Sequence, residues 1–287
     1  MSIISAIFQA IIQGVTEFLP ISSSGHLSLY QHFTGNSGEG ALMFSAILHL
    51  GTLVAVFVVF RQQIYELIME FISMIKDIFT RKFSVKNASP QRRLVFMYIV
   101  STLILIPFMI FKEMFEGFAE DESIFIEGIC FLYTAAILFM ADRTPAGKKR
   151  GIDASYRDSV VIGFFQGVAL LPGVSRSGST ISAGLFRGLT REAAVSYSFI
   201  LGIPAILGGA ALEIKDGIGQ ESSAGVLPCI IGFVVAAIVG VLSIKLVQML
   251  IKSDKFKIFW IYTGALGAVV IVIAIIEAII GHPIVIG

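Results

Sequence analysis

The sequence contains few charged residues: Asp, Glu, Lys and Arg make up 14% of its 287 positions, while hydrophobic residues make up 56%. An ordinary water-soluble domain carries about a quarter of its residues as these four charged types. With a mean hydropathy of +0.87, water is not the main solvent of this chain. The formal net charge of +1 provides no field that would attract a polyanion, so no nucleic-acid partner is expected.

Cysteine is also scarce. Cys130 and Cys229 both lie inside apolar stretches and show no metal-ligand spacing. The sequence therefore predicts neither a disulfide framework nor a thiolate metal site. A cleavable signal peptide is not expected, because the first apolar stretch has no basic flank before it and no small-residue cleavage site after it.

Long apolar stretches dominate the chain instead. Each is long enough to cross a bilayer as a helix. They cover residues 41–60, 94–111, 124–141, 193–212, 226–250 and 258–280. The fold class predicted from them is an all-α polytopic membrane protein with six full transmembrane helices.

A motif near the N-terminus recurs in the second half of the chain. The segment QGVTEFLPISSSGH (13–26) resembles QGVALLPGVSRSGS (166–179). Gln13 pairs with Gln166 and Gly25 with Gly178 at one offset, since 166 minus 13 and 178 minus 25 both give 153. Such self-similarity indicates an internal duplication, as in many transporter-like membrane folds.

Neither copy of the motif can form an uninterrupted span, because Pro20 or Pro172 followed by a Ser/Gly run removes helical hydrogen bonds. We therefore predict two re-entrant helical hairpins, each followed by three spans. Residues 1–141 form the first repeat, 142–158 a cytoplasmic linker, and 159–287 the second, inverted repeat.

The basic residues support the inverted arrangement. Of the 21 Lys and Arg residues, all except Lys112, Lys215 and Arg176, which makes 18, then fall on one side of the membrane. That side is cytoplasmic by the positive-inside rule. If each hairpin region instead crossed the membrane once, the Lys and Arg residues would be divided less unevenly between its two sides. Both termini and the opening of the first hairpin are expected outside.

Three ionisable residues fall inside the repeated motifs: Glu17, His26 and Arg176. Such residues are costly in a membrane and indicate function by default. Gln13 and Glu17 are four residues apart and share one helix face, where their oxygens suit Mg²⁺ or Ca²⁺. An ion pair between Glu17 and Arg176 is an equally good interpretation.

The Ser-rich loops offer further groups. Ser22, Ser23 and Ser24 precede His26, and Ser175 and Ser177 flank Arg176. Hydroxyls, helix N-terminal amides and a guanidinium make a cradle for phosphate oxygens. A Ser near a His also allows nucleophilic catalysis.

Three other ionisable residues need no catalytic role. His49, inside the first span, is expected to be a packing residue. Glu127 and Glu213 lie at or beside span ends, where solvation at the interface accounts for them.

QGVTEFLPISSSGH, followed in the second half by LLPGVSRSGST, resembles the motifs of the undecaprenyl-diphosphate phosphatases, also called bacitracin-resistance proteins. The resemblance covers nearly the whole chain. The family's first motif is Glu or Gln, three residues, then Glu; Gln13 and Glu17 form the Gln variant here, which leaves only one carboxylate for a metal.

The resemblance implies hydrolysis of undecaprenyl diphosphate to the monophosphate lipid carrier of bacterial wall synthesis, with divalent-metal dependence. The implied active site consists of residues from both loops. Glu17 with Gln13 would bind metal or orient groups, Ser23 would be the nucleophile, His26 the acid/base partner, and Arg176 with Ser175 and Thr180 would hold the diphosphate.

The implied location is the bacterial plasma membrane, with the active site opening toward the exterior. The implied partners are a polyprenyl diphosphate and membrane lipids; a homodimer is among the assemblies that the sequence allows. A lipid flippase or secondary transporter is the competing function, because inverted repeats with broken helices also build alternating access.

Overall fold

A computed structural model describes residues 1–35, 41–84, 88–110, 123–217, 225–253 and 255–285. Within these ranges the secondary structure is helical, and the only extended pairing is an isolated bridge between Lys149 and Leu189. The α-helices are α1 (Ile3–Thr16), α2 (Ser23–Thr34), α3 (Ala41–Val59), α4 (Arg61–Phe79), α5 (Pro90–Leu103), α6 (Leu105–Met109), α8 (Phe125–Asp142), α9 (Tyr156–Val168), α10 (Arg176–Phe186), α11 (Arg191–Gly217), α12 (Val226–Lys252) and α13 (Lys257–Ile280).

Six of the helical segments are long and apolar enough to span a membrane, which confirms the predicted number. They are α3, α5 with α6, α8, α11, α12 and α13. The second begins earlier than predicted, because Ser89 caps α5 and Pro90 occupies its first turn. The fourth continues to Gly217 and carries Pro204 inside it.

Both repeated motifs form two short helices joined by a break. Residues 17–22 separate α1 from α2, and residues 169–175 separate α9 from α10. Ser22 caps α2 by accepting a hydrogen bond from the Gly25 amide at 3.2 Å, and Ser175 caps α10 through the Gly178 amide at 3.0 Å. The predicted breaks are therefore confirmed, whereas re-entry of these hairpins into a membrane stays a prediction.

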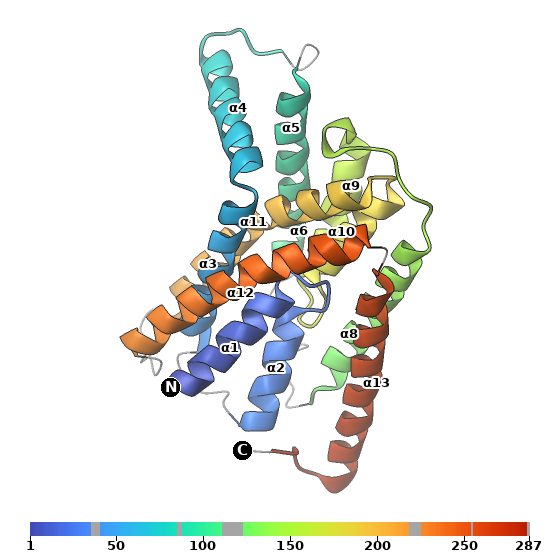
Figure 1. Cartoon of the computed structure of the whole chain (residues 1–287). Helices are drawn as coiled ribbons and strands as arrows, with labels where there is room; N and C mark the ends of the chain where they lie inside the picture. Colours follow the sequence, from blue (N-terminus) through green and yellow to red (C-terminus); the bar gives the residue numbers. More distant parts are fainter. Residues whose placement is uncertain (36–40, 85–87, 111–122, 218–224, 254, 286–287) are drawn as a thin grey trace.

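The two halves also pack in a similar pattern (Figure 1). Helix α1 contacts α2 and α12, and its counterpart α9 contacts α10 and the α5–α6 segment. Gly14 and Gly167, which share the repeat offset, provide the close approach: a Cβ atom at Gly14 would lie 2.8 Å from the Val239 Cβ of α12, and one at Gly167 would meet the Phe108 ring of α6. The inverted orientation of the halves stays a prediction, and both termini lie at the same end of the molecule in Figure 1.

The linker between the halves is fastened to α9 and to the end of α10. Asp158 is fully buried and binds Lys149 at 3.0 Å and Arg187 at 2.8 Å. Burial alone would raise the pKa of Asp158, but hydrogen bonds from Ser155 and the two cationic partners lower this pKa to about 2. The chain therefore enters α9 from a fixed position, which in turn fixes the start of the second hairpin.

Candidate functional site

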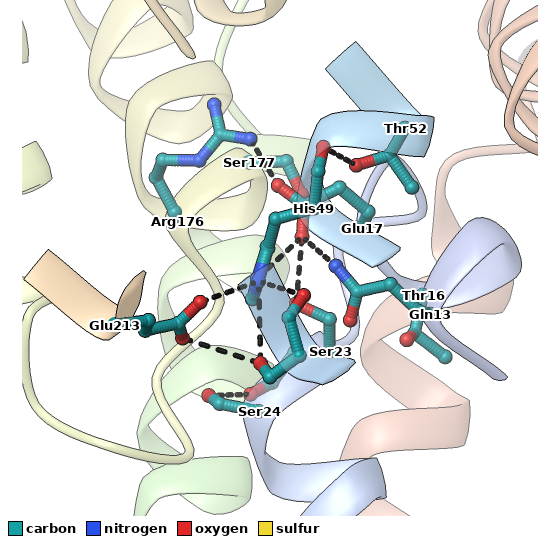
Figure 2. A network of polar contacts seen from close by, with 12 residues as sticks. Gln13, Thr16, Glu17, Ser23, Ser24, His49, Thr52, Arg176, Ser177 and Glu213 are labelled. Carbon is teal, nitrogen blue, oxygen red and sulfur yellow. Dashed lines mark hydrogen bonds and ion pairs between the residues drawn. The ribbon is translucent and has the colours of Figure 1, made fainter. Parts of the chain in front are cut away.

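The breaks of the two hairpins meet at one carboxylate. Ser23 is the first residue of α2, Arg176 is the first residue of α10, and Glu17 follows the last turn of α1. Because Ser22 and Ser175 cap their helices in the same way, Ser23 and Arg176 occupy equivalent positions. Figure 2 shows both side chains directed at Glu17.

Glu17 is buried, with 7% of its surface exposed, and each of its oxygens is bound. Arg176 donates to Oε1 at 2.6 Å, and the Ser23 hydroxyl donates to Oε2 at 2.9 Å. Gln13 donates its amide to the same Oε2, also at 2.9 Å. The ion pair with Arg176 is thus present, together with hydrogen bonds from Ser23 and Gln13.

The oxygens around Glu17 suit a hard cation only in part. Within the described ranges, no group of three or more His, Cys, Asp or Glu side chains could hold a metal ion. The Gln13 Oε1 atom is buried and has no partner among the described residues, so one carboxylate, one amide oxygen and the Ser23 hydroxyl are at hand. Mg²⁺ commonly binds through one or two carboxylates and takes its other ligands from substrate phosphates and water. Glu17 and Ser23 line a cavity that Gln13 does not line, so the carboxylate and the hydroxyl fit a metal that takes its other ligands from phosphate and water.

His49 and Glu213 form a second polar pair, next to the Oε2 atom of Glu17. The His49 Nε2 atom of α3 is 3.9 Å from Glu17 Oε2, and His49 Nδ1 is 3.5 Å from Glu213 Oε2 of α11. The Ser45 hydroxyl donates to Glu213 Oε1 at 3.2 Å, and the Ser45 carbonyl lies 3.1 Å from His49 Nδ1. The imidazole is therefore held with Nε2 toward the Glu17 carboxylate (Figure 2).

These groups line a cavity of about 340 Å³. Its polar wall includes Glu17, Ser23, Arg176, His49 and Glu213. The rest of the lining is largely apolar and comes from α6, the residues after α9 and the middle of α11, with Leu105, Ile106, Met109, Leu170, Pro204 and Ile206. A ligand with a polar head and an apolar chain matches such a cavity.

Of the remaining predicted serines, three line the cavity and one stabilises a helix end. Ser24, Ser175 and Ser177 line the cavity, whereas Ser22 is a buried cap. The Ser24 hydroxyl accepts from the Gly173 amide at 3.2 Å, and the Ser177 hydroxyl donates to the Leu19 carbonyl at 3.2 Å. Each loop therefore holds the other in place.

Thr180 lies one turn beyond Arg176. Its hydroxyl donates to the Arg176 carbonyl at 2.8 Å and lies 2.6 Å from the Ser198 hydroxyl of α11. It is buried and does not line the cavity. Its contacts fasten α10 to α11, and a direct contact with substrate stays a prediction.

His26 lies apart from the other predicted catalytic residues. Its Nδ1 atom is 2.7 Å from the Ser22 carbonyl and its Nε2 atom 2.7 Å from the Tyr262 hydroxyl, with the two rings stacked. It does not line the cavity that Glu17, Ser23 and Arg176 share. These contacts tie α2 to α13, and the acid/base role of His26 stays a prediction.

Sequence reasoning does not select His49 and Glu213 for the site, because packing is a sufficient explanation for His49 and interfacial solvation for Glu213. The usable signal is the cost of an ionisable residue in an apolar helix, which applies to His49 as much as to Glu17. Their pairing is hidden in the sequence because they belong to different spans, far apart along the chain.

The sequence is matched by the model of a known family. The family model described as bacitracin resistance protein BacA matches residues 6–269, which include both loops and both spans of the His49–Glu213 pair. The chain belongs to this family. Three similar proteins match this chain along almost their whole length.

An undecaprenyl-diphosphatase of Alkaliphilus metalliredigens is 39% identical over 278 residues, which cover 96% of this chain and 100% of that protein. One of Methanosphaera stadtmanae is 40% identical over 283 residues, with 96% and 99% covered. Undecaprenyl-diphosphatase 4 of Bacillus thuringiensis is 37% identical over 276 residues, with 94% and 97% covered. The family resemblance inferred from the two motifs is thereby confirmed.

Proposed function

We propose that this membrane protein hydrolyses undecaprenyl diphosphate to undecaprenyl phosphate and inorganic phosphate. The observation that carries the proposal is the contact of Ser23 and Arg176 with the two oxygens of Glu17, inside a cavity with one polar and one apolar wall. The names of the three relatives support this substrate. The activity would recycle the lipid carrier of wall synthesis and so provide resistance to bacitracin.

The cavity accounts for binding of an amphipathic lipid. The prenyl chain lies along the apolar residues of α6 and α11, among surrounding membrane lipids. The diphosphate then reaches the ends of α2 and α10, where helix N-termini favour negative charge. Arg176 grips phosphate oxygens with its planar fork, and the hydroxyls of Ser24 and Ser175 belong to the lining of the same cavity.

In the first chemical step, the Ser23 Oγ atom attacks the terminal phosphorus and its proton passes to Glu17 Oε2, which already accepts that hydrogen bond. The bond from this phosphorus to the bridging oxygen breaks, and undecaprenyl phosphate leaves with that oxygen and its electron pair. In the second step water attacks the phosphoserine, the bond between Oγ and phosphorus breaks, and Oγ takes back the proton held by Glu17. The hydroxyl of the water stays on the released phosphate, and its other proton passes through Glu17 to solvent. Arg176 offsets negative charge on the phosphate oxygens in both steps.

The proposed cofactor is Mg²⁺ or Ca²⁺, held by Glu17 and Gln13 together with oxygens of the bound diphosphate. When bound, the ion would neutralise charge on the diphosphate oxygens. Gln13 contributes by holding Glu17 in place and by its unpartnered Oε1 atom.

We place the protein in a bacterial plasma membrane with the active site open to the exterior. The support for this orientation is the distribution of 18 of the 21 Lys and Arg residues on the opposite side. Single cysteines introduced into the linker 142–158 of a Cys130→Ser, Cys229→Ser background test it. Labelling of the linker from outside intact cells contradicts the orientation.

Phosphate release from undecaprenyl diphosphate by the purified protein in detergent tests the activity. An enzyme releases phosphate without a membrane gradient, whereas a flippase or secondary transporter releases none. The assay with a chelator tests the metal, because unchanged turnover after chelation contradicts it.

Ser23→Ala tests the nucleophile. We expect kcat and kcat/KM to fall together by on the order of a thousandfold while lipid binding persists, because only a group needed in the transition state is lost. If the folded variant turns over at the parent rate, the nucleophile is a different group.

A further inference from the structure

Gln166 of α9 is a polar residue whose burial is not explained by any hydrogen bond of its side chain among the described residues. Its side chain is 2% exposed and lines the 340 Å³ cavity. Neither Nε2 nor Oε1 has a hydrogen-bond partner among the described residues. A buried amide that remains unpaired costs stability, so such a group in a native protein calls for an explanation.

The internal repeat explains why this amide is unpaired. Gln166 is the counterpart of Gln13, and Leu170 is the counterpart of Glu17, since 170 minus 17 also gives 153. In the first half, Gln13 donates to Glu17 one helical turn away at 2.9 Å. In the second half the glutamine is present but its carboxylate partner is replaced by an apolar side chain. The amide of Gln166 is therefore available for a group that does not belong to the protein.

The position of Gln166 indicates which part of a ligand it meets. Ala169 and Leu170 follow the end of α9, and both line the same cavity as Gln166. Leu105 of α6 continues this apolar wall. Glu17 and Ser23 approach from α1 and α2 instead. Because α9 packs against α6, Gln166 lies beside the apolar residues that α6 contributes to the cavity lining.

We propose that the Gln166 amide donates hydrogen bonds to the phosphate adjoining the prenyl chain, the phosphate that stays on the lipid after hydrolysis. This inference rests on the proposed function, because it assigns one of the two phosphates of that substrate. Arg176 and Ser23 serve the terminal phosphate, and Gln166 serves the inner one. The division explains how a neutral amide can be useful beside an apolar wall, where a second cation would be costly.

Gln166→Met is the sharpest variant, because methionine is unbranched and of similar length but has no polar atoms. We expect two opposite changes: a higher melting temperature, since an unpaired buried amide is removed, and a dissociation constant for farnesyl phosphate at least about tenfold higher. A residue with a purely structural role would not combine these changes.

Gln9→Met is the matched control. Gln9 is also buried, but its amide donates to the Ser5 hydroxyl at 3.2 Å and it does not line this cavity. We expect a lower melting temperature and an unchanged dissociation constant for farnesyl phosphate. Gln166→Leu provides a second apolar variant if Gln166→Met does not fold.

Farnesyl phosphate in detergent serves as the probe because its binding requires no catalysis. If the parent protein binds this probe and releases phosphate from the diphosphate, but Gln166→Met binds the probe equally well, the inference is overturned. If the parent releases no phosphate, the proposed function fails instead. A lower melting temperature of folded Gln166→Met also overturns the inference, because the amide then has a partner within the protein.

Discussion

The two interhelical breaks end in the same kind of serine cap and carry different chemistry. Ser22 and Ser175 each accept a hydrogen bond from the glycine amide three residues later, and each is followed by the first residue of a short helix. That first residue is Ser23 in one break and Arg176 in the other, and both donate to Glu17. The first hairpin thus provides the acceptor and the nucleophile, and the second provides the cation.

The difference between the halves shows how a duplicated framework can hold an asymmetric reaction. The helix caps and the close-packing glycines recur in both halves, so each half provides a similar break, and the two breaks meet at the site. The chemistry differs because side chains at equivalent positions differ, for example Glu17 against Leu170 and Ser23 against Arg176. We expect substitutions at these positions to have unequal effects on turnover, and substitutions at the caps to have similar effects on stability.

Glu17→Gln should have the largest effect. The amide cannot accept the Ser23 proton, and it removes the charge that holds Arg176 and any metal. We expect kcat to fall by about 10²- to 10⁴-fold, the range for loss of a general base. Phosphate release by the purified variant measures this.

Glu127→Gln is the control for Glu17→Gln, because Glu127 is also buried but accepts from Ser28 outside the cavity. Its turnover should stay near that of the parent. An active Glu17→Gln enzyme would show that Glu17 is not the base.

Arg176→Lys tests the second hairpin. Lysine keeps the positive charge but cannot reproduce the fork that binds two phosphate oxygens, so we expect kcat/KM to fall by about a hundredfold. The matched control is Arg187→Lys, which pairs with Asp158 at the far end of α10. Near-normal kcat/KM in Arg176→Lys would remove the guanidinium from direct phosphate contact.

His49→Leu tests whether the site extends beyond the two hairpins. His49 lies near Glu17 Oε2, opposite the oxygen that binds Arg176, and we expect its loss to lower kcat about tenfold. His49→Gln should retain most activity, because its amide can lie near the imidazole Nε2 position. His282→Leu, which removes an exposed imidazole near the C-terminus, is the control. Equal activity of the Leu and Gln variants would assign His49 to packing.

The smallest effects should come from the caps. Ser22→Ala and Ser175→Ala should each lower the free energy of unfolding by about 1 kcal/mol. Substitution by glycine should affect the two positions differently, because Ser22 has a φ of 74° and Ser175 a φ of −71°. We expect Ser22→Gly to be neutral or stabilising, since glycine adopts positive φ without strain, and Ser175→Gly to cost a few tenths of a kcal/mol. Denaturant unfolding in detergent measures both, and equal glycine effects would contradict the proposed strain at Ser22.

The sequence determined the fold class and the framework of the site. Apolar length predicts the spans because a helix in a bilayer must satisfy its own backbone hydrogen bonds. Proline followed by serine and glycine predicts the breaks, because these residues end helices locally. The repeat offset relates the two breaks. The ionisable residues within them single out Glu17 and Arg176, and the family resemblance adds Ser23.

Only the tertiary structure decided which side chains share the cavity. His26 follows Ser23 closely in sequence, yet its ring contacts Tyr262 on α13. His49 and Glu213 come from separate spans, and they meet near Glu17 because α3 packs against α11. Gln166 is buried without a partner among the described residues because the repeat kept the glutamine and not the carboxylate. Local sequence fixes the helix ends, but the side chains facing the cavity depend on long-range helix packing, which a single sequence does not encode in any local pattern.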